Sequence, residues 1–533
     1  MTKTQKLLAV IFAAVILAFL SISFLLNFSL AREPLSAFIS GEIDLKEFTK
    51  QIQEVYKSDV DSKNSYININ GLFARISGRQ TYNEVVRLNN GMLTYSSIPV
   101  RDMDAFADGI ADFDSFLESN GIEYVFLQCP IKSDINDELV PVGVENYGNS
   151  NANLLISNFD ELGVEYIDFR PALAGSVEQI EKYFYDTDHH WNADASFYAY
   201  KEIISMLKAK FPDAKFDDNA LLESSWTRTV YEDWFLGSHG KRVGEYFAGV
   251  DDFILYTPNF ATDMSMYIPK HKSFTSGTFE QTLVKSSYLD EPNYFDETPY
   301  CTYTGGDYPL VHHVNYNAKN DIKVLIIKDS FTLATQAFLS TQVREVDVID
   351  PRYYTDMSIA EYVAASSPDI VLTMINPTSF QRKEYCNIAT AGAVAMLNKT
   401  AEKPLGEIES IKVTSPVDKT NKNFVVTDYI SDEGLYDLRG GEKYKLSIGD
   451  VKFNSGSGDG FTVALYDNVS GTIVGSYAFD LQNKSESGSY EWSFFVPKNS
   501  KAKYKLVVYA GLHGKTNGNA VEFEDVTLSR WVK

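Results

Sequence analysis

The chain has few cysteines, which excludes two classes of small protein. It contains 3 in 533 residues (Cys129, Cys301 and Cys386). At most one disulfide can form, and one thiol is then left over. No C-x-x-C pair is present for a zinc or thiol-redox site. The sequence is therefore neither a disulfide-stapled scaffold nor a cysteine-based metal module.

Basic residues are also scarce. Lys and Arg number 48 against 72 Asp and Glu, which gives a net charge of −24. Nucleic-acid binding requires a basic surface that neutralises phosphates, so DNA and RNA are excluded as partners. The first 32 residues carry three basic side chains and no acidic one. The remainder holds 45 basic and 72 acidic residues, a net charge of −27.

One long uncharged run stands at the N-terminus. Leu7–Leu26 is 20 apolar or small residues, which at about 1.5 Å per residue spans the roughly 30 Å hydrocarbon layer of a bilayer. Lys3 and Lys6 precede it, which favours a cytoplasmic N-terminus and an exported remainder. We therefore predict an uncleaved membrane anchor over residues 1–31, and a cell-membrane protein with an extracytoplasmic body.

A cleaved signal peptide is the alternative for this segment. Ser29 and Ala31 occupy the −3 and −1 positions of a cleavage site before Arg32. The apolar run is longer than the usual signal core of about 7–15 residues, which favours the anchor. Because the exported part is strongly acidic, we expect the N-terminal anchor alone to attach it to the membrane, without binding of the exported part to anionic lipid.

Residues 101–402 alternate between short apolar strands and helical segments. This pattern predicts an α/β domain with a parallel sheet covered by helices on both faces. A segment over 211–320 interrupts the alternation, and we expect it to be a large insertion lying over the sheet. The predicted strands are Glu123–Gln128, Val164–Asp168, Ile322–Ile327, Glu345–Ile349 and Asp369–Ile375. The predicted helices are Met103–Ser119, Asn151–Leu162, Ala193–Lys210, Phe331–Ser340, Ile359–Ser366 and Ser379–Leu397.

The flanking regions differ from this domain. We expect residues 32–100 to form a stem that packs on the main domain, with a helix over Ile43–Tyr56 and strands over Ile67–Ser77 and Met92–Val100. Residues 408–533 show short alternating runs between Gly, Asn and Ser turns, which predicts a β-sandwich that is a candidate carbohydrate-binding module. Four of its side chains are candidates for stacking on sugar rings, although packing within the sandwich is favoured for each: Trp492, Tyr509, His513 and Trp531.

The densest group of polar residues is the segment 185–192, Tyr-Asp-Thr-Asp-His-His-Trp-Asn, between a predicted strand and a predicted helix. Asp188 and His190 are two residues apart, so in extended backbone both side chains point to one side. A carboxylate there holds the imidazole in one tautomer, as a general base requires. The alternative is a polar loop in which Asn192 caps the next helix. A metal site built from Asp188, His189 and His190 has no spaced partner of zinc type, so we predict no metal and no cofactor.

A second candidate site follows the strand Ile322–Ile327. Ser330 stands in Lys-Asp-Ser-Phe (328–331), at the junction between that strand and a predicted helix. Free N–H groups at a helix start stabilise negative charge, so a serine there can attack an acyl carbon while its own N–H holds the oxyanion. A lone serine is more often an ordinary helix cap. The Asp188 and His190 pair favours the catalytic interpretation.

These two motifs carry a resemblance. Asp-His-His-Trp (188–191) followed downstream by Lys-Asp-Ser-Phe (328–331) resembles the DHHW family of Gram-positive envelope proteins. More broadly, residues 60–400 are similar to the alginate O-acetyltransferase (AlgX/AlgJ-like) branch of SGNH-type hydrolases. The resemblance implies an SGNH-like fold with Ser330 as nucleophile, His190 as base and Asp188 as the orienting carboxylate.

The resemblance also implies a function. It is that of a membrane-anchored O-acetyltransferase of a cell-envelope or secreted polysaccharide, which works through a serine acyl-enzyme. The expected partner is a membrane-bound O-acyltransferase that supplies acetyl groups. Two alternatives remain. One is a carbohydrate esterase with the same triad, and the other is a non-catalytic polysaccharide-binding or assembly protein.

Four further residues are weaker candidates for the site. Arg242, in a glycine-bounded basic loop, is a candidate clamp for an acidic sugar or an oxyanion, or else part of a solvated turn. Gly306 is a candidate backbone donor or a tight-turn residue. Asn376 follows a strand end and is a candidate pocket residue, as is His189. The pair His312 and His313 is expected to be structural.

Overall fold

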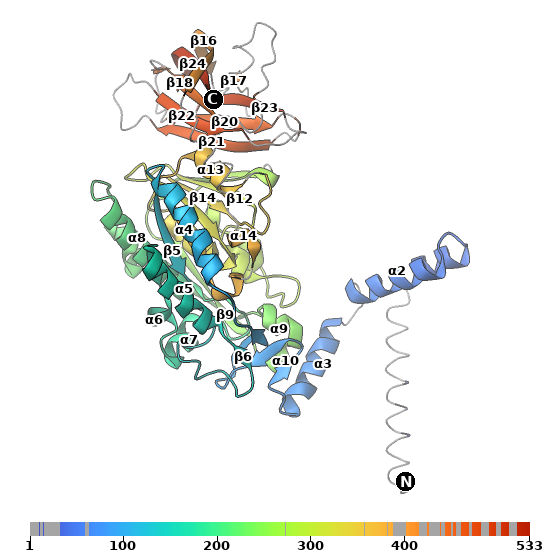
Figure 1. Cartoon of the computed structure of the whole chain (residues 1–533). Helices are drawn as coiled ribbons and strands as arrows, with labels where there is room; N and C mark the ends of the chain where they lie inside the picture. The colour runs from blue at the N-terminus through green and yellow to red at the C-terminus, as the bar shows by residue number, and fades with distance from the viewer. Residues whose placement is uncertain are drawn as a thin grey trace. The chain divides into compact units, whose positions relative to one another are not determined.

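The computed structural model describes residues 32–58, 63–271, 273–356, 358–380 and 382–386, the strands after residue 400 with a few residues between them, and three isolated positions before residue 32. The chain divides into two compact units (Figure 1). The first consists of residues 1–83 and 240–249, and the second of residues 84–239 and 250–533.

In the first unit, helices α2 (Leu45–Ser58) and α3 (Lys63–Ile76) are described. The sequence pattern predicted a strand over Ile67–Ser77, and this is wrong. The alternation of Ile and Asn at 67–70 imitates a strand, but Asn68, Gly71 and Ala74 form a buried helical face instead. Gly71 allows this packing because a Cβ there would lie 2.0 Å from the carbonyl oxygen of Val243.

Nothing in the described part of the chain is both long enough and apolar enough to be a membrane-crossing helix. The predicted anchor Leu7–Leu26 lies almost wholly outside the described residues. It stays a prediction.

The second unit is built on an eight-stranded sheet in the order β11-β10-β12-β14-β13-β15-β5-β7. Strands β14, β13, β15, β5 and β7 are parallel, as the apolar runs predicted. The strands are β5 (Glu123–Gln128), β7 (Tyr166–Asp168), β10 (Met264–Ile268), β11 (Ser273–Gly277), β12 (Leu310–Asn315), β13 (Lys323–Lys328), β14 (Glu345–Ile349) and β15 (Ile370–Ile375).

Alternate residues of the central strands enter two separate cores, one on each face of the sheet. Val125 and Leu127 of β5 belong to one core, whereas Tyr124 and Phe126 belong to the other. Helices α8 (Ala193–Lys210) and α12 (Leu333–Leu339) contribute to the first core. Helices α4 (Asp104–Glu118), α5 (Gly148–Leu162) and α13 (Ile359–Ser366) contribute to the second. This double coverage explains why the central strands are continuously apolar.

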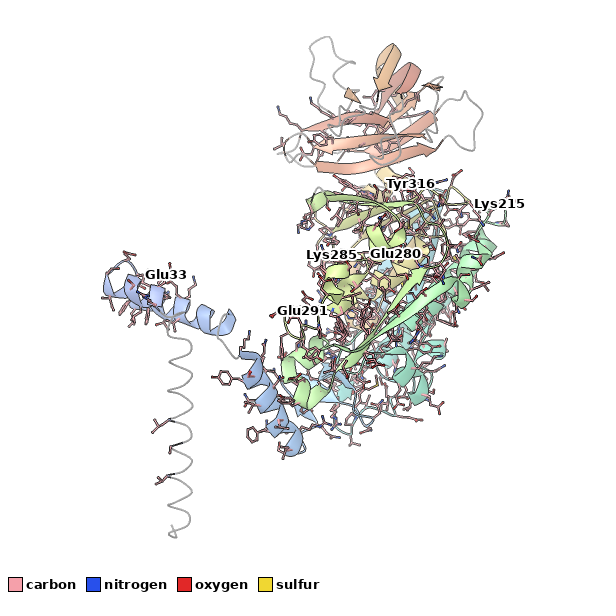
Figure 2. The ribbon with its side chains drawn as sticks, turned by 180° about the vertical axis from the view of Figure 1, so that it is seen from behind. Glu33, Lys215, Glu280, Lys285, Glu291 and Tyr316 are labelled. Carbon is pink, nitrogen blue, oxygen red and sulfur yellow. The ribbon has the colours of Figure 1, made fainter. Side chains whose placement is uncertain are left out.

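The insertion over 211–320 does not simply lie over the sheet. It supplies β10, β11 and β12, which extend the sheet by antiparallel pairing next to β14, so the sheet is mixed rather than parallel. The insertion also contains the antiparallel pair β8 (Trp226–Phe235) and β9 (Asp251–Pro258) and the short helix α11 (Phe279–Leu283). Figure 2 labels Glu280 and Lys285 in this segment and Tyr316 just after β12.

Short elements complete this unit. They are β2 (Val85–Arg87), β3 (Leu93–Tyr95), β4 (Ser97–Ile98), β6 (Glu145–Asn146), α6 (Arg170–Leu173), α7 (Val177–Tyr183) and α14 (Lys383–Cys386). The last is much shorter than the predicted helix Ser379–Leu397, whose residues after 386 lie outside the described ones.

After residue 400 the described strands form two sheets, as the alternating runs suggested. One contains β16-β24-β18-β22 with β19, and the other has the order β17-β23-β20-β21. The strands are β16 (Ala401–Thr414), β17 (Phe424–Val425), β18 (Lys443–Ile448), β19 (Val451–Asn454), β20 (Gly460–Asp467), β21 (Thr472–Asp480), β22 (Tyr490–Phe495), β23 (Tyr504–Ala510) and β24 (Ala520–Val532). Trp492 is 2% exposed and stacks on Phe494, so it packs inside rather than offering a sugar-binding face.

Candidate active site

The site forms where the loop 184–192 meets the carboxyl end of strand β13. The loop connects α7 to α8, so two short helices separate it from strand β7 rather than the strand leading into it directly. Ser330 is the first residue of a short 3-10 turn, Ser330–Thr332, that leads into α12. Parallel strands place such junctions at one edge of the sheet, where α/β folds commonly bind ligands.

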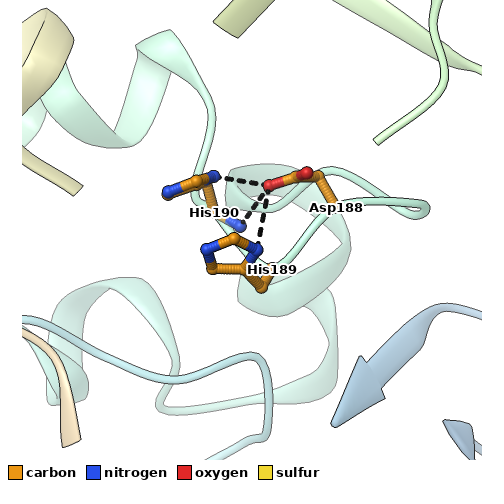
Figure 3. A group of neighbouring side chains, drawn as sticks. All are labelled: Asp188, His189 and His190. Carbon is orange, nitrogen blue, oxygen red and sulfur yellow. Dashed lines mark hydrogen bonds and ion pairs between the residues drawn. The ribbon is translucent and has the colours of Figure 1, made fainter. Parts of the chain in front are cut away.

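Asp188, His190 and Ser330 are joined in one chain of hydrogen bonds. The Nε2 atom of His190 lies 2.6 Å from the Ser330 hydroxyl oxygen. Its Nδ1 lies 2.5 Å from Oδ1 of Asp188, which also accepts the His190 backbone N–H. Figure 3 shows the carboxylate facing both histidines. Since Nδ1 faces a carboxylate, the imidazole presents Nε2 to the serine in the form that accepts a proton.

The carboxylate of Asp188 is buried and remains ionised. Burial alone would raise its pKa. Electrostatic interactions with the His189 and His190 imidazoles, together with hydrogen bonds from His190 and from the backbone N–H of Ser238, instead hold the pKa of Asp188 well below its usual range. Burial and the neighbouring His190 imidazole depress the pKa of His189, so the His189 ring is neutral. The Nδ1 atom of His189 lies 2.8 Å from the Ser238 hydroxyl, next to the Asp188 contact.

The loop before Asp188 is held by two buried ionisable residues from other elements. The Lys132 ammonium donates to the carbonyl oxygens of Tyr185 and Asp186, at 2.6 and 2.9 Å. Asp251, at the start of β9, accepts the backbone N–H groups of Asp186 and Thr187 and the Thr187 hydroxyl. Together they fix both the donors and the acceptors of this short stretch of backbone.

A glycine is required beside the carboxylate. A Cβ on Gly237 would lie 2.3 Å from the Cβ of Asp188, which is too close for any side chain. The Gly237 backbone N–H also donates to the Thr187 hydroxyl at 2.7 Å. The Gly237-Ser238 pair therefore supports the site through its backbone, a role that the sequence pattern of a basic loop did not suggest.

The nucleophile junction is built around Asp329. Its carboxylate accepts the Phe331 N–H through one oxygen, and the Asn376 N–H, the Asn376 side-chain amide and the Ser379 hydroxyl through the other. Burial raises its pKa. Asn376 thus lies at the junction, and its role as a pocket residue stays a prediction. Its described contacts tie it to Asp329 and to Thr378 rather than to Ser330.

Tyr300, from the insertion, touches both the base and the nucleophile. Its ring stacks on the His190 imidazole, with centroids 3.9 Å apart and planes 12° apart. Its hydroxyl donates to the backbone carbonyl of Ser330 at 2.9 Å. Trp191 also connects the loop to the nucleophile junction, because its indole N–H donates to the Phe331 carbonyl at 2.8 Å. Tyr300 is one of 33 tyrosines and no motif surrounds it, so the sequence could not single it out.

The remaining predicted residues lie elsewhere or stay untested. Gly306 has a φ of 119° and lies beside Cys301, in a turn that glycine favours. No described contact joins it to Ser330, and its donor role stays a prediction. Arg242 belongs to the first unit, where its backbone carbonyl accepts from Asn83 at 2.7 Å. His312 and His313 lie within β12, buried in the sheet.

The same loop also has the composition of a metal site. Asp188, His189 and His190 each offer a ligand atom, and these atoms lie within 4.8 Å of one another. Both ring nitrogens of His190, however, already contact Asp188 and Ser330, and Oδ1 of Asp188 accepts two hydrogen bonds. A cation there would displace the network, so these contacts suit proton transfer better than metal binding.

A separate cavity of about 600 Å³ lies at the opposite edge of the sheet. Its lining includes Ile322 and Asp369, which precede β13 and β15, together with Phe211 and Lys319. Ser330 follows the other end of β13. The cavity is therefore not part of the candidate active site.

Several solved structures are similar to the chain. Among solved structures, the chain is similar to Bacillus cereus PatB1, with 20% identity, 56% of this chain and 98% of that chain covered, and a TM-score of 0.48. A DHHW family protein from Eubacterium siraeum shows 20% identity, covers 58% and 95%, and has a TM-score of 0.43. Pseudomonas aeruginosa AlgX shows 13% identity, covers 83% and 94%, and has a TM-score of 0.33. No curated protein sequence matches the chain.

A family model matches a defined part of the chain. Residues 99–231 match the SGNH hydrolase-like domain of the acetyltransferase AlgX. The match includes Asp188 and His190 and ends before Ser330, so only the three-dimensional contact joins the serine to the matched segment. The resemblance predicted from the two motifs is thereby confirmed: this chain resembles the AlgX-type SGNH hydrolase-like domain.

Proposed function

We propose that this protein is an O-acetyltransferase that modifies a cell-envelope or secreted polysaccharide through an acyl-enzyme on Ser330. The observation that carries the proposal is the 2.6 Å contact between His190 Nε2 and the Ser330 hydroxyl, with Asp188 on the other ring nitrogen. The resemblance of residues 99–231 to the AlgX acetyltransferase domain supplies the reaction class. We further propose an extracytoplasmic location behind the N-terminal anchor, with a membrane-bound O-acyltransferase as acetyl donor.

The reaction proceeds in two half-reactions. His190 accepts the Ser330 hydroxyl proton as the serine oxygen attacks the acetyl carbonyl carbon, and the imidazolium then protonates the leaving group. Acetyl-Ser330 remains. In the second half, His190 takes the proton of a sugar hydroxyl as the sugar oxygen attacks the acetyl carbonyl carbon, and the imidazolium then protonates the departing Ser330 oxygen. The ionised Asp188 stabilises the imidazolium in both halves, and the Ser330 N–H is the proposed oxyanion donor.

The test compares two serine variants. Ser330→Ala should lower p-nitrophenyl acetate cleavage and acetyl transfer to an oligosaccharide acceptor by about 10³-fold or more, because the nucleophile is removed. Ser286→Ala changes an exposed serine of the insertion and should leave both rates unchanged. Unchanged rates in Ser330→Ala would contradict catalysis of either kind and favour a binding or assembly role.

A partition measurement separates the transferase from an esterase. With wild-type protein, raising the acceptor concentration should increase acetylated sugar and lower free acetate in equal amounts, since both consume the same acetyl-Ser330. Acetate release that is insensitive to every acceptor tested would point to hydrolysis instead.

A further inference from the structure

Helix α3 of the first unit has two unlike faces. One face carries Asn68, Gly71 and Ala74, which are buried. The amide of Asn68 donates to the Glu245 carboxylate at 2.6 Å, so this face is fixed to the segment 240–249 of the same unit. The opposite face consists of large apolar side chains at the i, i+3, i+4 and i+7 positions of one helical stripe: Ile69, Leu72, Phe73 and Ile76.

This apolar stripe is exposed. Ile69 and Leu72 are 43% and 39% exposed, and Phe73 and Ile76 are 65% and 73% exposed. Single exposed apolar residues are ordinary, but four adjacent ones on one helical face mark an interaction surface. The helix already has its packing partner on the other side, so the stripe is not needed to hold the unit together.

Basic residues outnumber acidic ones in α3, the residues just after it and the segment packed on it, although the whole protein is acidic. Residues 63–83 and 240–249 contain five basic residues and one acidic residue, Glu245, although the whole chain has a net charge of −24. Arg75 lies within α3 itself, and its guanidinium donates to the Tyr246 carbonyl at 3.3 Å. The other basic residues are Lys63, Arg79, Lys241 and Arg242. An apolar stripe with a basic residue at each end of the helix, Lys63 at its start and Arg79 just after it, suits the boundary between acyl chains and anionic headgroups.

The position of α3 in the chain favours the same occupant. Its first residue, Lys63, follows Leu26, the end of the apolar run Leu7–Leu26, by fewer than 40 residues. If that run spans a bilayer, α3 is tethered close to the membrane surface, and the effective concentration of the surface is high. A helix with only weak affinity for lipid is then sufficient to stay bound to the membrane surface.

We propose that α3 lies on the membrane surface, with the apolar stripe at the acyl boundary and the basic residues at its two ends, Lys63 and Arg79, against anionic lipid headgroups. The net charge of the exported part is negative, which argued against lipid binding. Residues 63–83 are an exception, because they contain three basic residues and no acidic one. The proposal is independent of the acetyltransferase activity, and its test requires no turnover.

The experiment places a tryptophan on the stripe in the full chain. Phe73→Trp and the matched control Val142→Trp, at a fully exposed site of the second unit, are combined with vesicles of brominated phosphatidylcholine with and without phosphatidylglycerol. Bromine quenches only tryptophans that contact the lipid. We expect roughly half or more of the added Phe73→Trp emission to be quenched in phosphatidylglycerol vesicles, and less without that lipid or in high salt. The Val142→Trp emission should stay unquenched.

A third variant tests the charges. Adding Lys63→Glu and Arg79→Glu to Phe73→Trp should reduce the quenching about twofold or more in phosphatidylglycerol vesicles. Thermal melting of every variant verifies that the chain is folded. The proposal is overturned if Phe73→Trp is quenched no more than Val142→Trp, or if quenching is indifferent to phosphatidylglycerol. A blue shift that grows with protein concentration without lipid would assign the stripe to a second copy of the chain, which also overturns the proposal.

Discussion

The second unit contains two buried Asp–His pairs with nearly the same local geometry and different surroundings. In the first, Asp188 Oδ1 lies 2.5 Å from His190 Nδ1, and in the second, Asp347 Oδ1 lies 2.7 Å from His312 Nδ1. The first pair lies in a loop at the carboxyl edge of the sheet, and its Nε2 contacts Ser330. The second pair joins neighbouring strands β12 and β14, and its Nε2 has no described hydrogen-bond partner and is buried.

The comparison separates what makes an Asp–His pair stable from what makes it reactive. Burial opposes ionisation of Asp347, but the charges of Lys323 and His312 and the hydrogen bonds from His312 and Tyr362 hold its pKa well below the usual range. Asp188 is shifted in the same direction by similar contacts. A depressed carboxylate pKa is therefore common to both pairs. The difference is the group that the second ring nitrogen reaches.

Loss of the orienting carboxylate is expected to have the largest effect. Asp188→Asn should lower kcat for p-nitrophenyl acetate by about 10³- to 10⁴-fold, because an amide favours the wrong tautomer of His190. KM should change little, since Asp188 does not face the substrate.

The matched control is Asp347→Asn. We expect it to leave kcat within about threefold of wild type. The free energy of unfolding should fall by about 3 kcal/mol, since Lys323 and His312 lose a buried charged partner. Equal losses of kcat in Asp188→Asn and Asp347→Asn would remove the distinction between the pairs. A urea titration monitored by circular dichroism gives the stability.

The next largest effect on kcat is expected from the aromatic ring that stacks on each imidazole. Tyr300→Leu should lower kcat by roughly 10- to 100-fold, because His190 loses the ring stacked on it and Ser330 loses a contact to its carbonyl. Tyr300→Phe retains the ring, so we expect a loss of only a few-fold. Tyr267 stacks on His312 at a centroid distance of 6.1 Å, and Tyr267→Leu should leave kcat unchanged. A steady-state assay with p-nitrophenyl acetate measures all three, and a full-size loss in Tyr300→Phe would assign the role to the hydroxyl instead.

The sequence predicted the central strands and the main helices well, because their patterns are local. A strand buried on both faces must be a continuous apolar run, and β5, β14, α8 and α13 have the bounds that the patterns gave. Asp188 and His190 were also visible locally, since only one residue separates them. Ser330 was found only because a strand end and a familiar motif coincide.

Other parts of the site had no such signal. Lys132, Asp251 and Tyr300 reach the loop 185–190 from sequence separations of about 50 to 110 residues, and nothing in their neighbours marks them. The antiparallel edge β10–β12 was missed because its strands carry polar residues such as His312 and His313 within the run. Helix α3 was predicted as a strand because only its contact with Val243 reveals which side of it is buried. Pairing and packing across the chain decide these features.

The smallest expected effect is on the pH dependence of the free energy of unfolding, to which both Asp–His pairs contribute. A carboxylate whose folded pKa is depressed stabilises the fold above its unfolded pKa of about 4, and that stability is lost as the pH falls toward the folded pKa. Between about pH 4 and pH 2 the unfolded chain takes up a proton that folded Asp347 does not. Asp347→Asn should therefore lower the slope of unfolding free energy against pH by up to about one proton, and Asp188→Asn by a similar amount. Urea unfolding of the three proteins across this range measures the slopes. If both variants change the slope by a similar amount but differ in kcat, a depressed carboxylate pKa marks a buried Asp–His pair without revealing whether the pair is catalytic. A slope change in only one variant would show that the two carboxylates differ in the folded state as well.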